Sequence, residues 1–451
     1  MLRSPRPMKK HRNPIPEVSL TKHAFQWSCG SVHQVDKDQV KNGDRTRLGD
    51  DEESILKDAR VLIFAAGLLV RILLITIYVD RDALAWIRAG QIIDAHGLSS
   101  LYSFEGSGYR YPPFWSYVCA TAYSLDPVTD FQNNLFLVLI KSPLIIADSL
   151  TFYIITDFLR KKATPKLAAL GGILYFLNPF VIYVGAYLGV FDSLVVMFLV
   201  LTVYFLDEQD PVGGGLAAGL AVLTKQYAFP LVLALFVLTC KNGERQKAFC
   251  FAGLILLIFG GASLPFLNYN RQSYIDAILY STSGPIRQSS TGLWSVFWNL
   301  ERHTPIEVIS WFPWLENIDY DIFYGGLLIP LAIITMSKDI SEDGICLIAS
   351  LCFLCFSPQV HSQYLVLFIP FLIMEILRHE LHPFWYFLTV LPMIFQAMPN
   401  SWQTMFITSI VLFLAFLGLL TQTVYDVVIR GQDRVELAKR RIPACFEYSS
   451  C

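Results

Sequence analysis

Two aspartates flank an arginine at the end of the first long apolar run of the chain. The run covers about residues 60–79, and Asp80, Arg81 and Asp82 follow it directly. Charges at the edge of a membrane are costly unless they are solvated or used. A carboxylate within hydrogen-bonding reach of a hydroxyl group can take its proton, so the pair is a candidate general base. A purely structural interpretation is that the pair only caps the helix after it.

The segment after this pair combines a helical pattern with an aromatic and proline-rich end. Leu84, Ile87 and Ile92 recur near helical spacing, which predicts an amphipathic helix lying on the membrane. Residues 109–113 read Tyr-Arg-Tyr-Pro-Pro. The apolar run at about 112–125 is too short to span a membrane upright, so we expect it to be re-entrant or partly embedded.

Lys225 lies between two short apolar runs, at about residues 213–225 and 228–240. This pattern predicts two helices that meet at a polar break. A lysine at that depth either has a function or extends its ammonium to the membrane surface, and the sequence leaves both interpretations open.

Four other charges lie in or beside apolar runs. An internal partner such as Asp148 would explain Arg71, and Lys141 and Asp148, seven residues apart, could instead pair within the bundle. Asp192 begins an apolar run, and we interpret it as part of a cavity rather than as a helix cap.

Composition restricts the class of protein. The chain has 451 residues, of which 54% are hydrophobic and 16% charged, with a mean hydropathy of +0.46 and a net charge of −2. An average soluble domain is roughly 25% charged. A water-soluble core of this size cannot hide so much apolar surface, which excludes a soluble enzyme, a DNA-binding module and a disordered scaffold.

The predicted fold is an all-α, polytopic membrane bundle of about 11–13 helices, whose outward first loop carries amphipathic helices. We divide the chain into a mostly disordered cytosolic tail (1–59), a membrane domain (60–422) and a cytosolic tail (423–451). The candidate spans lie at about 60–79, 134–158, 166–186, 190–206, 247–267, 321–337, 343–357, 363–378, 383–398 and 403–422.

Basic residues set the orientation, because lysine and arginine near helix ends stay in the cytosol. Basic clusters near residues 160–166, 241–247 and 430–441 put both termini on the cytosolic side. Residues 80–112 and 268–320 must then face outward. The second of these segments holds four tryptophans, and we favour anchoring at the membrane interface over sugar stacking for them. They are Trp294, Trp298, Trp311 and Trp314.

The ordered set of motifs resembles the GT-C glycosyltransferases, multi-spanning enzymes that take a sugar from a polyprenyl-phosphate donor. The closer likeness is to the mannosyltransferases that add the first mannose of GPI anchors and to their archaeal and bacterial relatives. In that family an acidic D-x-D follows the first span and Y-R-Y-[TP]-P ends the loop, as at residues 80–82 and 109–113 here. Residues 177–180 resemble its N-P motif and residues 357–364 its S-Q-Y element, where Pro-Gln-Val-His replaces a K-V-x-T. The likeness covers roughly residues 60–400.

This resemblance implies an inverting single displacement in which one of the two aspartates is the base. Asp80 is favoured, and Asp82 would orient the acceptor. Because the leaving group is a phosphate, cations and hydrogen-bond donors should surround it. The candidates for binding the donor are Arg81, Arg110, Tyr111, Lys225, His361 and Gln363. His361 could equally be a satisfied interfacial histidine.

The resemblance further implies that no cofactor is needed. A pair of aspartates could hold Mg²⁺ or Mn²⁺, but a lipid monophosphate carries less charge than a nucleotide diphosphate, so no metal site is predicted. The expected activity is a hexosyltransferase, with mannose favoured, that uses a polyprenyl- or dolichyl-phosphate sugar. Its partners would be that donor, a lipid-linked or glycan acceptor on the extracytoplasmic face and the bilayer, with no nucleic acid.

The expected location is the endoplasmic reticulum membrane in a eukaryote or the plasma membrane in a prokaryote. Two other functions stay open. A flippase or transporter for lipid-linked oligosaccharides would use the intramembrane charges. A non-catalytic subunit of a transferase would keep the fold and need a partner chain.

Overall fold

The computed structural model describes residues 59–78, 81–127, 134–283, 292–296, 315–337, 340–358, 360–378, 381–397 and 402–430. Asp80, Gln359 and almost all of the two predicted tails lie outside these ranges. The described residues belong to one compact unit and contain helices and turns but no strand.

The first helix covers residues 59–74. The later elements are α2 (Arg81–His96), η1 (Leu98–Ser100), α3 (Phe114–Leu125), α4 (Asn134–Lys162), α5 (Pro165–Phe176), α6 (Pro179–Ile182), η2 (Tyr183–Leu188), α7 (Asp192–Asp207), α8 (Pro211–Thr224), η3 (Gln226–Ala228), α9 (Phe229–Lys241), α10 (Arg245–Ser283), α13 (Leu315–Met336), α14 (Glu342–Phe356), η4 (Ser362–Leu367), α15 (Ile369–Leu377), α16 (Phe384–Ala397), α17 (Trp402–Tyr425) and η5 (Asp426–Arg430).

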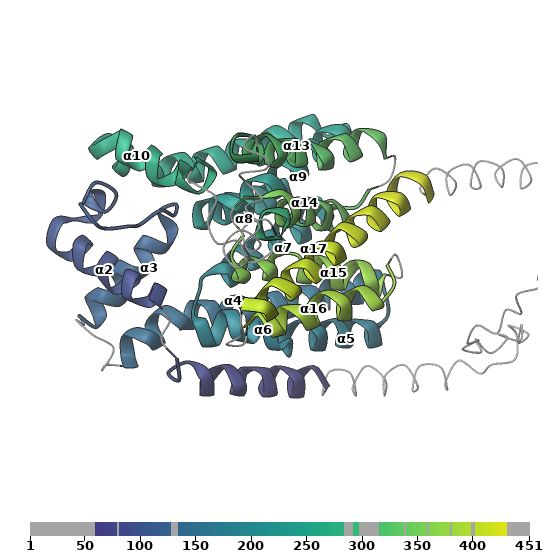
Figure 1. Cartoon of the computed structure of the whole chain (residues 1–451), viewed down its shortest axis with the longest axis horizontal. Coiled ribbons are helices and arrows are strands. Elements are labelled where there is room, and N and C mark those ends of the chain that lie inside the picture. Colours follow the sequence, from purple (N-terminus) through teal and green to yellow (C-terminus); the bar gives the residue numbers. More distant parts are fainter. Residues whose placement is uncertain are drawn as a thin grey trace, which may run out of the picture. The chain divides into compact units, whose positions relative to one another are not determined.

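The predicted class, an all-α bundle of apolar helices in a membrane, agrees with this architecture (Figure 1). Among the described residues, three helices are long and apolar enough to cross a membrane alone, at Leu135–Lys162, Arg245–Leu279 and Gln403–Val428. A fourth span results if Pro165–Phe176 and Pro179–Leu188, which are bent by 44°, count as one. The other predicted runs form shorter helices, so the chain is an integral membrane protein with fewer single long helices than expected.

Asn178 and Pro179 explain one of the breaks. The Asn178 side chain accepts hydrogen bonds from the backbone N–H groups of Phe180 and Val181, which caps α6. Proline is favoured in the first turn of a helix because it has no N–H to satisfy there. The Asn178 amide also donates to the hydroxyl of Tyr386 at 2.9 Å, so the Asn-Pro motif ties α5 and α6 to α16.

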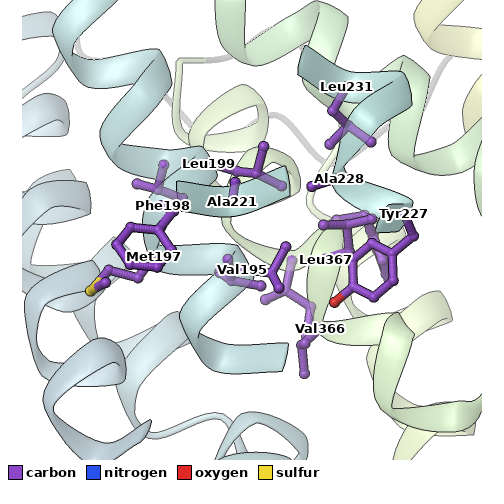
Figure 2. Packing of buried hydrophobic residues seen from close by; sticks show 14 of the residues in the cluster. Val195, Met197, Phe198, Leu199, Ala221, Tyr227, Ala228, Leu231, Val366 and Leu367 are labelled. Atoms are coloured by element: carbon purple, nitrogen blue, oxygen red, sulfur yellow. The ribbon is translucent and has the colours of Figure 1, made fainter. Parts of the chain in front are cut away.

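Helix α7 forms the centre of the core. Nearly every residue along it is buried, as expected for a helix that is apolar on all sides. It packs against α4 and α8, and α8 packs in turn against α10 (Figure 1). Figure 2 shows side chains of α7, α8, α9 and the η4 turn packed together. The polar residue at the start of α7, Asp192, is therefore held inside the protein.

Helix α2 confirms the predicted amphipathic helix and packs on α3 (Figure 1). Its buried face includes Trp86, Ile87 and Ile92. Leu84, which the pattern assigned to the same face, is 53% exposed, so that assignment was wrong. The apolar run at 112–125 forms α3, which begins directly after Pro113.

Helix α10 differs from the prediction that an outward loop begins at residue 268. It continues to Ser283 and is broken at Asn270, whose φ and ψ of −152° and 88° are not helical. Asn270 restarts the helix, because its side chain accepts a hydrogen bond from the backbone N–H of Ser273. Trp294 is not an interface anchor, since it is buried and its indole N–H donates to the carbonyl of Phe356. The other three tryptophans of this segment lie outside the described residues.

Arg71 and Asp148 form the buried pair that the sequence suggested. Arg71 Nε lies 3.1 Å from Asp148 Oδ2, and both side chains are fully buried. A second Arg71 nitrogen donates to the carbonyl of Phe176 at 2.8 Å. The pair thus joins the first helix, α4 and the end of α5, and it is the alternative Lys141–Asp148 pair that is wrong.

Candidate functional site

The polar break at Lys225 is a real interruption between two helices. Helix α8 ends at Thr224, Lys225 has an extended backbone with φ −148° and ψ 136°, and α9 begins at Phe229. The Lys225 ammonium does not extend to the membrane surface, because the residue is only 1% exposed. Its nitrogen lies 2.8 Å from Oδ2 of Asp192. The break therefore directs the ammonium of Lys225 into the core of the protein.

Asp192 supplies the counter-charge that offsets the free-energy cost of burying Lys225. It is the first residue of α7, and the residue before it, Phe191, makes no capping hydrogen bond. Its second carboxylate oxygen accepts a hydrogen bond from the hydroxyl of Tyr227 at 2.6 Å. A buried charge needs both a counter-charge and hydrogen bonds for its remaining lone pairs, and Asp192 has both. Asp192 also benefits from the positive end of the helix dipole.

Aromatic rings surround the Lys225 ammonium. Its nitrogen lies 4.5 Å from the ring centre of Phe191, 4.9 Å from that of Tyr364, 5.2 Å from that of Tyr111 and 5.6 Å from that of Tyr227. Cations within about 6 Å of a ring centre are attracted to the ring. The four rings come from four different segments of the chain. We call Lys225, Asp192 and these rings the lysine cage.

The Tyr-Arg-Tyr-Pro-Pro segment is held against the lysine cage by its backbone. The hydroxyl of Tyr102 donates to the carbonyl of Tyr111 at 2.7 Å. The amide of Gln226, next to Lys225, donates to the carbonyl of Arg110 at 3.2 Å. The conformation of this loop and the polar break between α8 and α9 are therefore coupled.

Asp82 lies in the first turn of α2 and is half-buried. Burial raises the pKa of Tyr111 far above its usual value, and the charges of Asp82 and Asp192 raise it further. The Tyr111 phenol thus stays neutral and keeps its proton for donation. The same two carboxylates act electrostatically on Tyr364. Asp82 is therefore within electrostatic range of Tyr111 and Tyr364.

His361 and Gln363 are close in the chain to Tyr364, a ring of the lysine cage. The His361 imidazole is exposed, and its ring centre lies 5.4 Å from that of Tyr364 in an edge-to-face arrangement. Gln363 is half-buried in the same η4 turn. Arg110 is half-buried too, and burial lowers the pKa of its guanidinium while Tyr111 raises it.

The structure brings together part of the set of residues that the sequence predicted. Lys225 and Tyr111 are in direct contact, and Asp82 is within electrostatic reach of Tyr111. Asp80 and the side chain of Arg81 lie outside the described part of the chain.

Sequence reasoning did not assign three rings of the lysine cage to the site, namely Phe191, Tyr227 and Tyr364. The sequence did contain one feature that pointed to part of this set of residues. Two charges of opposite sign, Asp192 and Lys225, stand in apolar runs, and each of them has an aromatic residue within two positions.

Lys141 supports the chain just before the aspartate pair. Its buried ammonium donates to the carbonyls of Tyr78 and Tyr187, at 2.8 Å and 2.7 Å. Gly189 has a φ of +75°, and a Cβ there would lie 2.7 Å from Lys141 Cε. Lys141 therefore joins the end of the first helical segment to the η2 turn.

The described residues contain no group of three or more His, Cys, Asp or Glu side chains that could hold a metal ion. Asp80 is not among them, so the absence of a metal site stays a prediction.

Comparison with known proteins gave matches to solved structures and to one family model. No curated protein sequence matches the chain. Two solved structures of ArnT from Cupriavidus metallidurans, one in the apo state and one bound to undecaprenyl phosphate, are similar at 15% identity and a TM-score of 0.48, over 82% of this chain and 77% of theirs. The model of glycosyltransferase family 87 matches residues 109–337, which begin at the Tyr-Arg-Tyr-Pro-Pro segment and include Asp192 and Lys225. Since this match covers half of the chain, the chain belongs to glycosyltransferase family 87.

Proposed function

We propose that this glycosyltransferase moves a hexose, with mannose favoured, from a polyprenyl- or dolichyl-phosphate donor to a lipid-linked or glycan acceptor. Transfer takes place on the extracytoplasmic face and inverts the anomeric configuration. The observation that carries the proposal is the lysine cage, in which a buried ammonium lies 5.2 Å from the ring of Tyr111 while Asp82 acts on the same tyrosine. A cation beside an acidic group is what a phosphate leaving group and an attacking hydroxyl require.

The reaction is one displacement at the anomeric carbon of the sugar. The acceptor hydroxyl oxygen forms the new bond to that carbon, and the bond from the carbon to the phosphate oxygen breaks. Its electron pair stays on the departing polyprenyl phosphate. The proton of the acceptor hydroxyl passes to a carboxylate, for which we favour Asp80, with Asp82 orienting the acceptor. No cofactor or metal ion takes part in this scheme.

The remaining side chains stabilise the leaving group. Lys225 supplies positive charge, and the neutral phenol of Tyr111 can donate a hydrogen bond, because burial and two nearby carboxylates keep it protonated. Arg81, Arg110, His361 and Gln363 complete the proposed set around the donor phosphate and sugar. Stabilising the charge that develops on a leaving oxygen is often the largest contribution of an enzyme to its rate.

The favoured compartment follows from the same proposal. Polyprenyl-phosphate sugars are membrane lipids, and the two aspartates were predicted to face outward from the orientation of the basic loops. The protein would then act in the endoplasmic reticulum membrane of a eukaryote or the plasma membrane of a prokaryote.

The test is sugar transfer in reconstituted membranes. Wild type would receive radiolabelled polyprenyl-phosphate mannose or polyprenyl-phosphate glucose, with a panel of lipid-linked acceptors. Transfer of mannose in preference to glucose, with an inverted anomeric centre in the product, is the expected result. Transfer from a nucleotide sugar but not from either lipid donor would contradict the proposal, as would retention of configuration.

A further inference from the structure

Two buried indole N–H groups beside the lysine cage have no hydrogen-bond partner. Trp86 is 2% exposed and Trp115 is fully buried, and the Nε1 atom of each is unpaired in the structure. Their ring centres are 5.9 Å apart. Buried tryptophan N–H groups usually find an acceptor, because leaving one without an acceptor costs free energy. Two such donors in contact therefore require an explanation.

Trp86 is linked to the lysine cage through two rings. Its ring centre lies 5.4 Å from that of Phe191 and 5.9 Å from that of Tyr111. Both of these rings also face the Lys225 ammonium. Trp86 follows Asp82 by four residues on α2, and residues at this spacing lie on the same side of a helix.

Several donors in this part of the molecule lack an acceptor. The ammonium of Lys225 has three N–H bonds, and among the described residues its hydrogen bond to an oxygen goes to Asp192. Trp86 and Trp115 add two indole donors that have none. The ring faces around Lys225 attract its cation, and the phenol oxygens of Tyr111, Tyr227 and Tyr364 are the acceptors that these rings carry. An oxygen of a bound molecule would give the indole N–H groups the acceptor that the described residues do not supply.

The chemistry of that oxygen can be narrowed down. A water molecule or a sugar hydroxyl would accept from these donors but would bring hydrogens of its own, which then need acceptors. A phosphate oxygen is an acceptor and carries the negative charge that Lys225 favours. A phosphate therefore fits the unpaired indole donors and the positive charge of Lys225 better than either alternative.

We propose that the indole N–H of Trp86 donates a hydrogen bond to a phosphate oxygen of the polyprenyl-phosphate donor, next to Lys225. This inference rests on the proposed function and adds a residue to the donor site that motif reasoning did not assign. Trp86 then fixes the phosphate from the α2 side, while Lys225 holds it from the break between α8 and α9. Without the lipid phosphate the indole donor stays unpaired.

The test is binding of a polyprenyl phosphate to the full chain in nanodiscs. Trp86→Phe keeps an aromatic ring and removes the N–H. A second variant replaces Trp86 with 3-benzothienylalanine, which keeps both fused rings and lacks the N–H. The matched control is Trp115→Phe, because Trp115 has the same buried, unpaired N–H and its recorded ring contacts are to Trp86 and Phe191 rather than to Tyr111.

Both Trp86 variants should bind polyprenyl phosphate about tenfold or more weakly, as expected for the loss of a hydrogen bond to a charged group. The Trp115→Phe control should bind within about twofold of wild type. The thermal midpoint without lipid should change little in the benzothienylalanine variant, which keeps the buried volume, and should fall in both phenylalanine variants, which lose part of it. The rise in that midpoint on adding lipid should shrink only in the Trp86 variants.

Three results would overturn the inference. If the benzothienylalanine variant binds polyprenyl phosphate as wild type does, Trp86 does not contact the phosphate, although the proposed function stands. If inorganic phosphate displaces the lipid at comparable concentration, the site recognises free phosphate instead. If wild type binds no polyprenyl phosphate at all, the proposed function fails, and this inference fails with it.

Discussion

The ammonium of Lys225 lies 2.8 Å from a carboxylate oxygen of Asp192, although 33 residues separate them in the chain. Lys225 is the first residue after α8 and Asp192 is the first residue of α7, and neither side chain is more than 2% exposed. Such a pair is neutral as a unit, and four aromatic rings lie around the ammonium of the lysine.

Removing one member of this pair should destabilise the protein more than removing both. Lys225→Met or Asp192→Asn each leaves a buried group without its partner, at a cost of roughly 3–5 kcal/mol. The double variant should recover much of this loss in the thermal midpoint and still fail to bind polyprenyl phosphate. As a control, Lys162→Met at the more exposed Lys162–Asp207 pair should cost at most about 1 kcal/mol. Full transfer by the double variant would rule out Lys225 as a phosphate ligand.

Loss of the Asp82 carboxylate should impair turnover rather than donor binding. Asp82→Asn is expected to lower kcat by about 10²–10⁴-fold if the group takes or directs the acceptor proton. The matched control is Asp94→Asn, an exposed aspartate on the same helix, which should transfer sugar within about twofold of wild type. Initial rates and the Kd for polyprenyl phosphate would be measured side by side. Equal kcat values for Asp82→Asn and wild type would remove Asp82 from the mechanism.

Asp148 should matter for stability and not for chemistry. Asp148→Asn leaves the buried guanidinium of Arg71 without its counter-charge, so we expect roughly 3–5 kcal/mol of destabilisation. Asp157→Asn on the same helix α4 provides the comparison, because Asp157 is 32% exposed in its salt bridges and should cost about 1 kcal/mol or less. The KM for the donor of the folded fraction should be unchanged in both. A specific rise in KM for Asp148→Asn would contradict this assignment.

The surroundings of Glu342 lead us to expect that the stability of the folded protein depends on pH. Burial raises the pKa of this carboxyl, and the neighbouring charges of Asp207 and Asp343 add to the rise. The folded state therefore binds the proton of Glu342 more tightly than the unfolded state does. The free-energy cost of burying the charged carboxylate is absent below the pKa that Glu342 has in the unfolded state. It grows as the pH rises and is complete above the folded pKa. Glu342→Gln should therefore raise the thermal midpoint at pH 8 more than at pH 4.

The comparison variant for this effect is Glu244→Gln, whose carboxylate is 34% exposed and bridges to Lys247. The difference in midpoint between this variant and wild type should not grow with pH. A Glu342→Gln variant whose advantage is the same at both pH values would show that the carboxyl is not destabilised by its surroundings.

Much of the fold followed from local pattern. The apolar runs became helices, the break at Lys225 separated α8 from α9, and the predicted amphipathic helix formed as α2, with Asp82 in its first turn. The lengths of the helices were less predictable, since α10 continues past residue 268 to Ser283. Asn270 both interrupts and restarts that helix, and polarity alone makes such a segment look like a loop. The burial of Trp294 was missed for a related reason, because a tryptophan suits an interface and a core equally well.

By itself, the sequence determined that this is a helical membrane protein and that acidic, aromatic and basic motifs occur in a particular order. The tertiary structure decided which charges meet: Lys225 with Asp192, and Arg71 with Asp148 rather than Lys141 with Asp148. It also revealed the unpaired N–H of Trp86. This difference has a physical reason. Hydrophobic periodicity depends on residues that are near one another in the chain, so the sequence shows it directly. The partner of a buried charge depends instead on which distant segments pack within about 4 Å of it, where electrostatic attraction in an apolar surrounding is strong.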